Sequence, residues 1–386
     1  MAREAVIVEA VRTPLGKRDG KLSGWHPVDL LAEVLNETVA RTKIDAGVVD
    51  DVICGCVSQV GEQSLNVGRN AWLAAGLPEE VPATTIDRQC GSSQQSAHFA
   101  AQGVIAGAYD VAIACGVESM SRVPMGSSAQ SPGFPFPDSL MGRYEGGLVP
   151  QGISAEIISE RWGITREDAD RFGARSHERA IKATEDGAFK NEIHPIKVED
   201  ELFEIDEGMR APNLEKMATL KTAFKEDGIV TAGNSSQITD GASVLLITTP
   251  EKAEELGLRP RARFVGFALA GTDPVTMLTG PIPSTRKLLE RTGVALEDID
   301  VVEINEAFAS VVLAWKKELG LDDAWFDEHV NIHGGAIALG HPLGASGARL
   351  MTTGLNALEQ REGRYLLQTM CEGGGLANAT LLERLA

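Results

Sequence analysis

Residues 84–115 read TTIDRQCGSSQQSAHFAAQGVIAGAYDVAIAC, an apolar-to-polar run followed by a predicted helix and a predicted strand. We expect the helix to run from residue 92 to about residue 106 and the strand to cover 111–115. Other strand-like runs precede glycine-rich turns and helical stretches, at 5–11, 52–57, 263–268, 301–304 and 365–369. Because strands alternate with helices, the sequence predicts a layered α/β fold.

The pattern around Cys90 recurs in the second half of the chain. A helix is predicted from residue 345 to about 359, followed by the strand at 365–369. Arg41-Thr42 also precedes Asp50-Asp51 at the distance that separates Arg291-Thr292 from Asp300-Val301, an offset of 250 residues. Two similar halves would bring two helix starts together. Chance similarity among α/β units is the alternative.

Residues 120–239 differ in composition from the segments on either side. They are rich in Gly, Pro and Ser at 121–152 and carry a charged helical pattern at 154–187. We therefore expect a loop domain at 120–239, inserted into an N-terminal domain of 1–119 plus about 240–260. A C-terminal domain then covers 261–386.

Composition excludes several classes of function. The formal net charge of −19 argues against nucleic-acid or anionic-membrane binding, which needs a basic surface. No uninterrupted apolar run of ~18 residues is present, and the opening MAREAVIVEAVRTP lacks the features of an export signal. Five widely spread cysteines predict no disulfide framework. We expect a cytoplasmic protein without a metal site, since Cys54 and Cys56 form only C-x-C.

Cys90 lies at a position where a thiol can be reactive. The N-terminus of a helix presents free N–H groups and partial positive charge, which favour a thiolate and can stabilise an oxyanion. A buried structural cysteine is the competing interpretation. For Cys54, Cys56 and Cys115, which lie in apolar strand contexts, we expect packing roles.

Three further segments carry candidate functional groups. Asn305 follows a predicted strand, where it could orient a water or cap a helix. His341 lies in a glycine-rich loop that lacks the features of a phosphate-binding loop. Cys371 follows the strand at 365–369, beside a glycine-rich turn, and could donate or accept a proton.

Together these segments resemble one family. Cys90-Gly91-Ser92, Asn305-Glu306-Ala307-Phe308, Gly340-His341-Pro342 and Cys371-Glu372-Gly373 stand in the order and approximate spacing of the four thiolase signatures. The resemblance covers the whole chain. It implies two similar α/β/α halves in a five-layered αβαβα core, with the inserted loop domain lying over coenzyme A.

The resemblance also implies roles for the site residues. Cys90 takes the acyl group, His341 activates it, and Cys371 is the acid/base for the acetyl-CoA enolate and the incoming CoA thiol. Asn305, through a water, and His341 form one oxyanion hole. The backbone N–H groups of Cys90 and Gly373 form the second.

Coenzyme A is implied as a substrate, with no tightly bound cofactor. In family terms Ser236 contacts pantetheine and Arg210 contacts the nucleotide. The lysines at 216, 221 and 225 keep this stretch locally basic, and solvated surface residues are the other interpretation of them. The remaining contacts implied are Leu220, Gln151, Met277, Ala307 and Phe308. A homotetramer, built as a dimer of dimers, is the implied assembly.

The second cysteine separates this chain from the ketosynthases, which place histidines around one cysteine. Details such as the GEQS segment at 61–64 look most like actinobacterial degradative thiolases of lipid and steroid catabolism. We therefore expect CoA-dependent cleavage of a 3-ketoacyl-CoA. The alternatives are a biosynthetic acetoacetyl-CoA thiolase, a cysteine-dependent thioester hydrolase and a non-catalytic CoA-binding scaffold. One departure is His333, where the family usually has Asn, which puts the orientation of the His341 loop in doubt.

Overall fold

The computed structural model describes residues 3–130 and 132–385. Nine strands follow the order β10-β11-β12-β9-β1-β8-β5-β3-β4, and a short β2 (Gly16–Lys17) pairs with β8. Their bounds are β1 Val6–Arg12, β3 Asp51–Gly55, β4 Ala83–Ile86, β5 Val111–Ser119, β8 Thr239–Thr248, β9 Ala262–Gly271, β10 Val301–Ile304, β11 Tyr365–Glu372 and β12 Leu376–Arg384. All six predicted strands are confirmed, whereas β4, β8 and β12 were not predicted.

The strand order shows two halves that mirror each other. The first half runs β1-β8-β5-β3 and the second β9-β12-β11-β10, and the halves meet where β1 and β9 pair at only two positions. In each half, the third and fourth strands from this junction pair in parallel, β5 with β3 and β11 with β10, and β4 adds one more parallel strand at the edge of the first half. The predicted internal repeat is therefore present as a structural repeat, since α3 (Ser92–Ala106) and α12 (Ser346–Gln360) also occupy equivalent places.

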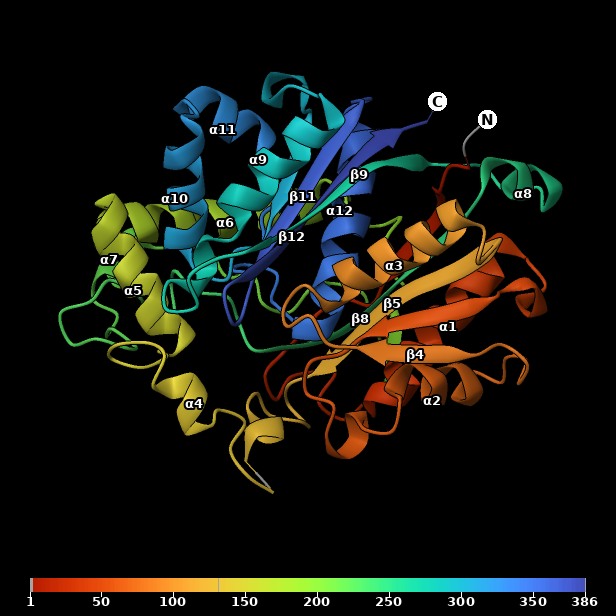
Figure 1. The fold of residues 1–386 in the computed structure, drawn as a ribbon, viewed down its shortest axis with the longest axis horizontal. Coiled ribbons are helices and arrows are strands. Elements are labelled where there is room, and N and C mark those ends of the chain that lie inside the picture. Colours follow the sequence, from red (N-terminus) through yellow and green to blue (C-terminus); the bar gives the residue numbers. More distant parts are fainter. Residues whose placement is uncertain (1–2, 131, 386) are drawn as a thin grey trace.

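Alternating side chains along the strands build the layers. In β5, Val111 and Ile113 face one apolar cluster while Ala112 and Ala114 face another. The first cluster packs the outer helices α1 (Pro27–Thr42) and α2 (Val67–Ala74) on the first half. The second encloses α3 and α12 between the two halves. A third cluster packs the outer helices of the second half, α9 Pro281–Thr292, α10 Ala309–Leu319 and α11 Asp323–His329. This gives the five layers visible in Figure 1.

Glycines allow the central helices to approach closely. A Cβ on Gly347 would lie 2.1 Å from the backbone nitrogen of Gln94, so only glycine fits there. Ala348 N–H also donates to Ser93 Oγ at 2.9 Å. The starts of α3 and α12 therefore lie side by side, and the segments carrying Cys90 and His341 converge.

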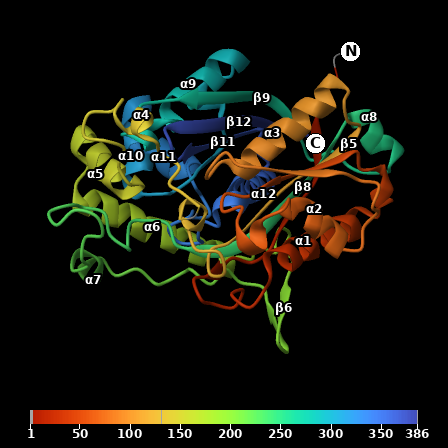
Figure 2. The same cartoon turned by 60° about the horizontal axis from the view of Figure 1, so that its bottom comes forward.

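The segment between β5 and β8 adds helices and a hairpin to one side of the core. Its elements are α4 Asp138–Met141, α5 Gln151–Trp162, α6 Arg166–Glu185, β6 Ile196–Val198, β7 Glu201–Phe203 and α7 Leu214–Ala218. The β6–β7 hairpin projects away from the core (Figure 2). Fully buried Arg12 ties the segment to β1, because its guanidinium group bonds Glu192 at 2.6 Å and Asp206 at 2.7 Å. The exact domain limits stay a prediction.

Short elements complete the chain. They are α8 Pro250–Glu255 and the 3₁₀ turns η1 Ala46–Val48, η2 Gly61–Gln63, η3 Ser127–Ala129, η4 Met277–Thr279, η5 Leu296–Asp298 and η6 Leu343–Ala345. Among the helices of the described ranges, none has the length and apolar character needed to cross a bilayer.

Candidate active site

Cys90 lies in a tight turn that leads into α3. Gln89 adopts a left-handed backbone conformation (φ 49°), and Ser92 Oγ accepts from Arg88 N–H and donates to the Gln89 carbonyl. The turn places Cys90 just before the helix N-terminus, with 4% of its surface exposed. Cys90 is therefore buried, but at the helix start that the sequence predicts.

Opposing effects act on the Cys90 thiol. Burial, with a contribution from Glu372, raises its pKa to about 12. The backbone N–H groups of Gly373 and Cys90 itself, together with the side chain of Gln151, lower it by hydrogen bonding. The two N–H groups implied as an oxyanion hole therefore lie near enough to this sulfur to act on its pKa. Gln151, expected to contact CoA, lies at the thiol.

His341 is held in one tautomer by its neighbours. Ser346 Oγ donates its single proton to the Pro342 carbonyl at 2.8 Å, so it accepts from His341 Nδ1–H at 2.6 Å. This leaves Nε2 unprotonated, 3.3 Å from Asn305 Nδ2. Burial, with a contribution from Arg349, lowers the His341 pKa to about 3. His341 is thus neutral, with Nε2 free to accept a proton.

Asn305 does not cap a helix, because α10 begins four residues later with Phe308 as its N-cap. Its side chain is fully buried, and within the described residues its Oδ1 atom has no hydrogen-bond partner. A buried acceptor of this kind suits a bound water. The adjoining Glu306 holds the glycine-rich loop in place, since it accepts from Ile337 N–H, Ser176 Oγ and Asn331 Nδ2.

Cys371 lies within β11, which continues to Glu372, and the expected strand end at residue 369 was wrong. The pairing with β12 extends the strand to the turn at 373–375. Cys371 is fully buried, and both burial and nearby Cys90 raise its pKa well above the usual range. It packs in one apolar cluster with Met277, Ala307 and Phe308. The two thiols and these three predicted CoA contacts therefore share one region.

The other expected CoA contacts lie on the inserted segment. Arg210, Lys216 and Leu220 line a cavity of about 220 Å³ together with Gly233. Ser236 N–H donates to the Ala307 carbonyl at 3.0 Å, which links this loop to the Cys371 cluster. Lys225 instead pairs with Glu160 and Asp227, a surface arrangement.

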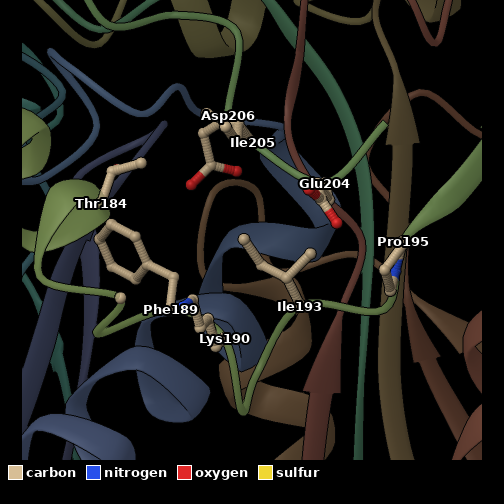
Figure 3. Close-up of a pocket in the computed structure, with 9 residues that line it drawn as sticks. Thr184, Phe189, Lys190, Ile193, Pro195, Glu204, Ile205 and Asp206 are labelled. Carbon is tan, nitrogen blue, oxygen red and sulfur yellow. The ribbon is translucent and has the colours of Figure 1, made fainter. Parts of the chain in front are cut away.

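A second hollow, of about 260 Å³, lies apart from the predicted site. Figure 3 shows Phe189, Ile193 and Ile205 around it, with the carboxylate groups of Glu204 and Asp206. Two carboxyl groups and Lys190 line it, and Asp206 is already paired with Arg12. None of the predicted site residues lines this hollow.

His333 points away from the catalytic groups. Its ring packs edge-on against Phe189 at 5.7 Å, and burial lowers its pKa to about 4. Glu306 accepts from Ile337 N–H in the loop that carries His341, and its carboxyl group fills the space beside Gly335. The effect of His333 on the orientation of this loop stays a prediction.

Sequence reasoning missed Ser346, Glu306 and Glu372 as parts of the site. Glu306 and Glu372 lie inside two of the quoted signatures, and the structure shows that both carboxyl groups are fully buried. Ser346 lies five residues after His341 and carries no pattern of its own.

The fold is a duplicated α/β fold in which Cys90 and His341 precede the two central helices, while Cys371 lies in β11 and buried Asn305 follows β10. Such a fold and site define a class of thiol-dependent acyltransferases. The family model for the thiolase N-terminal domain matches residues 5–251, and that for the C-terminal domain matches residues 258–384. The chain belongs to the thiolase family.

Relatives align along the whole length. Steroid 3-ketoacyl-CoA thiolase FadA6 of Mycobacterium tuberculosis is 51% identical, over 99% of this chain and 94% of that protein. The 3-oxoadipyl-CoA/3-oxo-5,6-dehydrosuberyl-CoA thiolase of Escherichia coli is 45% identical, over 99% of this chain and 100% of that protein. The crystal structure of the Bacillus anthracis acetyl-CoA acetyltransferase superposes with a TM-score of 0.90 at 40% identity, covering 100% of this chain and 99% of that chain.

Proposed function

We propose that this thiolase cleaves a 3-ketoacyl-CoA with coenzyme A, giving acetyl-CoA and a shortened acyl-CoA. The observation that carries the proposal is the convergence of two buried thiols, Cys90 at a helix start and Cys371 at a strand end, close enough for Cys90 to raise the pKa of Cys371. Two thiols allow one to carry the acyl group while the other moves protons.

The residues suit the steps of thiolysis. His341 Nε2 takes the Cys90 proton, and the thiolate attacks the 3-keto carbon. The bond between carbons 2 and 3 breaks, and Cys371 protonates the acetyl-CoA enolate. Cys371 then takes the proton of an incoming CoA thiol, and the CoA thiolate attacks the Cys90 thioester. The Cys90 thiolate leaves and takes its proton back from His341 as the shortened acyl-CoA is released. Because the Cys371 pKa is raised, the protonated form needed for the first transfer is favoured at rest.

Two oxyanion sites support these steps. The N–H groups of Cys90 and Gly373 would stabilise an oxyanion at one carbonyl, and His341 with an Asn305-bound water at the other. One such donor is typically worth about 3 kcal/mol of barrier.

The names of the relatives support a role in degradation, since they include a steroid and a 3-oxoadipyl-CoA thiolase. Biosynthetic condensation of acetyl-CoA is the second candidate, favoured by likeness to an acetyl-CoA acetyltransferase. We also propose that CoA is bound as substrate, with no tightly bound cofactor, and that the enzyme is cytoplasmic. Five free, buried cysteines suit a reducing compartment.

The test is CoA-dependent cleavage of a panel of 3-ketoacyl-CoA esters of increasing bulk. Wild-type protein should cleave at least one ester, and Cys90→Ala should cleave none and form no acyl-enzyme by intact mass. Release of free acid without CoA would instead identify a thioester hydrolase. No turnover of any ester would contradict the proposal.

A further inference from the structure

The structural repeat places a buried glutamate at the end of an equivalent strand in each half. Glu118 lies in β5 and Glu372 in β11, and both are fully buried. Each faces the start of a central helix: Glu118 contacts the segment before α12, and Glu372 the segment before α3. The same offset of 254 residues relates the two strands, the two helices and the two glutamates.

Glu118 has a complete set of partners. Its carboxylate accepts from Gly344 N–H at 2.8 Å, Val57 N–H at 2.9 Å and Ser58 N–H at 3.0 Å, and from Gln63 Nε2 at 2.8 Å. Four donors account for a carboxylate in such a buried place. Glu118 therefore joins three segments of the fold and has no free oxygen to offer.

Glu372 differs in that, within the described residues, neither carboxyl oxygen has a hydrogen-bond partner. One oxygen lies 2.0 Å from where a Cβ on Gly91 would stand, so the carboxyl group occupies the space next to the residue that follows Cys90. The Asn378 side chain borders the same space, but its Nδ2 atom donates to the Gly91 carbonyl. A buried carboxyl group without partners calls for a reason, because burial of a polar group without a hydrogen bond is unfavourable.

The groups facing Glu372 are few. In the turn before α3, the charge of Arg88 lowers the Glu372 pKa and the charge of Asp87 raises it. Cys90 and Cys371 are the two thiols beside Glu372. The Asn378 N–H on β12 lies near enough to lower its pKa without making a hydrogen bond. Burial outweighs these and raises the Glu372 pKa to about 8, so the carboxyl group is mostly protonated at neutral pH.

We propose that Glu372 is a positioning residue that sets the reactivity of Cys90 through its own charge. While the carboxyl group is protonated, it leaves the Cys90 thiolate undisturbed. Once ionised, it places a negative charge beside the sulfur and disfavours the thiolate. Cys90 then gains less reactivity with rising pH than an isolated thiol would. This inference rests on Cys90 being the nucleophile of the proposed function.

The experiment measures alkylation of Cys90 by iodoacetamide between pH 6.5 and pH 9, by peptide mass mapping of the full-length protein without any CoA ester. Wild type and Glu372→Gln should react at similar rates at pH 6.5. At pH 9 the Gln variant should react about tenfold faster, which corresponds to a difference of one unit in thiol pKa. Glu372→Asp, which keeps the charge, should follow the wild-type profile.

Controls separate this role from a structural one. Glu372→Leu, also uncharged, replaces the Gln variant if that variant fails to fold and should give the same profile. Glu251→Gln on the surface should leave the profile unchanged. A ratio of Gln to wild-type rates that stays constant across pH, or an Asp variant that behaves like the Gln variant, would overturn the proposal. Thiolysis by wild type, measured in parallel, tests the proposed function independently, since alkylation needs no substrate.

Discussion

Cys90 and Cys371 are both buried thiols, but only Cys90 stands at the start of a helix, where the Gly373 N–H group and the Gln151 side chain lower its pKa. Cys371 lies in a strand among apolar side chains. The difference in surroundings matches a division of labour in which one thiol is acylated and the other transfers protons.

Cys371→Ala should therefore retain acylation while losing turnover. The variant keeps Cys90, His341 and Asn305, so a reactive acyl-CoA should still label Cys90. Loss of general acid–base help typically costs about 10²–10⁴-fold in rate. Intact-mass spectrometry and steady-state thiolysis measure the two properties. Normal turnover, or label on Cys371 with Cys90 free, would show that the roles are wrongly assigned.

Arg210 borders the cavity on the inserted segment, far in sequence from the catalytic signatures. Arg210→Ala should raise the Michaelis constant for CoA several-fold with a smaller effect on kcat, because a contact with the nucleotide is made equally in ground and transition states. Lys225→Ala is a matched control, since Lys225 is paired with Glu160 on the surface. An unchanged Michaelis constant would remove Arg210 from the site.

At the scale of elements, the contact between α3 and α12 places the catalytic segments. Apolar side chains of both helices, such as Ala97 on α3 and Leu358 on α12, fill the space between the halves. The helices approach most closely at Gly347, which lies against the backbone of Gln94. Since backbone cannot move aside as a flexible side chain can, this contact leaves no room for a methyl group.

Gly347→Ala should destabilise the protein by about 1–3 kcal/mol, the usual cost of overpacking a core. Activity should fall with it, because the segments that carry Cys90 and His341, the proposed catalytic residues, lead into these two helices. Gly24→Ala is the control: a Cβ there meets nothing within 4 Å, and the residue has no positive φ, so the change should be close to neutral. Urea unfolding of both variants measures the difference. Equal stability would mean that the helices can separate freely.

At the scale of the whole molecule, three buried histidines and the partly buried His333 link folding to pH. Burial is the leading cause that lowers the pKa of His98 and His341 to about 3 and of His177 and His333 to about 4. The unfolded chain takes up these protons near pH 6.5, before the folded protein does. Their stabilising contribution is therefore present above about pH 6.5 and is lost as pH falls. Buried Glu303 and Glu372, with pKa raised to about 8, act in the opposite direction between about pH 4.5 and 8.

His333→Gln removes one of these titrating groups, at a position that packs against Phe189. Between about pH 6.5 and pH 4, the free energy of unfolding of the variant should fall less steeply than that of wild type, by about 1.4 kcal/mol per pH unit for one proton. Denaturant unfolding at pH 5, 6 and 8 measures this, and the pH 8 value corrects for lost packing against Phe189. Parallel curves would show that His333 is protonated in the folded protein.

The homotetramer stays a prediction at the same scale. The strand β4 ends the sheet in the described ranges, and Leu65, whose neighbour Asn66 donates to the Ala83 carbonyl of β4, is 88% exposed. An open sheet edge with exposed apolar side chains suits contact with a second copy. Light scattering should give a tetrameric mass at micromolar concentration. A fully active monomer would defeat the idea.

The sequence by itself determined the alternation of strands and helices, the repeat, the place of Cys90 and the family. These follow from local rules: side-chain periodicity, glycine-rich turns and short signatures that need no knowledge of distant contacts. It missed β8 and β12, whose side chains are buried on both faces and therefore lack the alternation that marks a strand.

Only the tertiary structure decided how the site works. The tautomer of His341 depends on Ser346 donating elsewhere, and Gln151 reaches the Cys90 thiol from the inserted segment. Glu118 is fully hydrogen-bonded because the fold brings donors such as Gly344, 226 residues away in the sequence, to its carboxylate. Glu372 receives no such donors within the described residues. Hydrogen bonding and burial of a charge depend on which distant segments the fold brings together, and no local pattern contains that information.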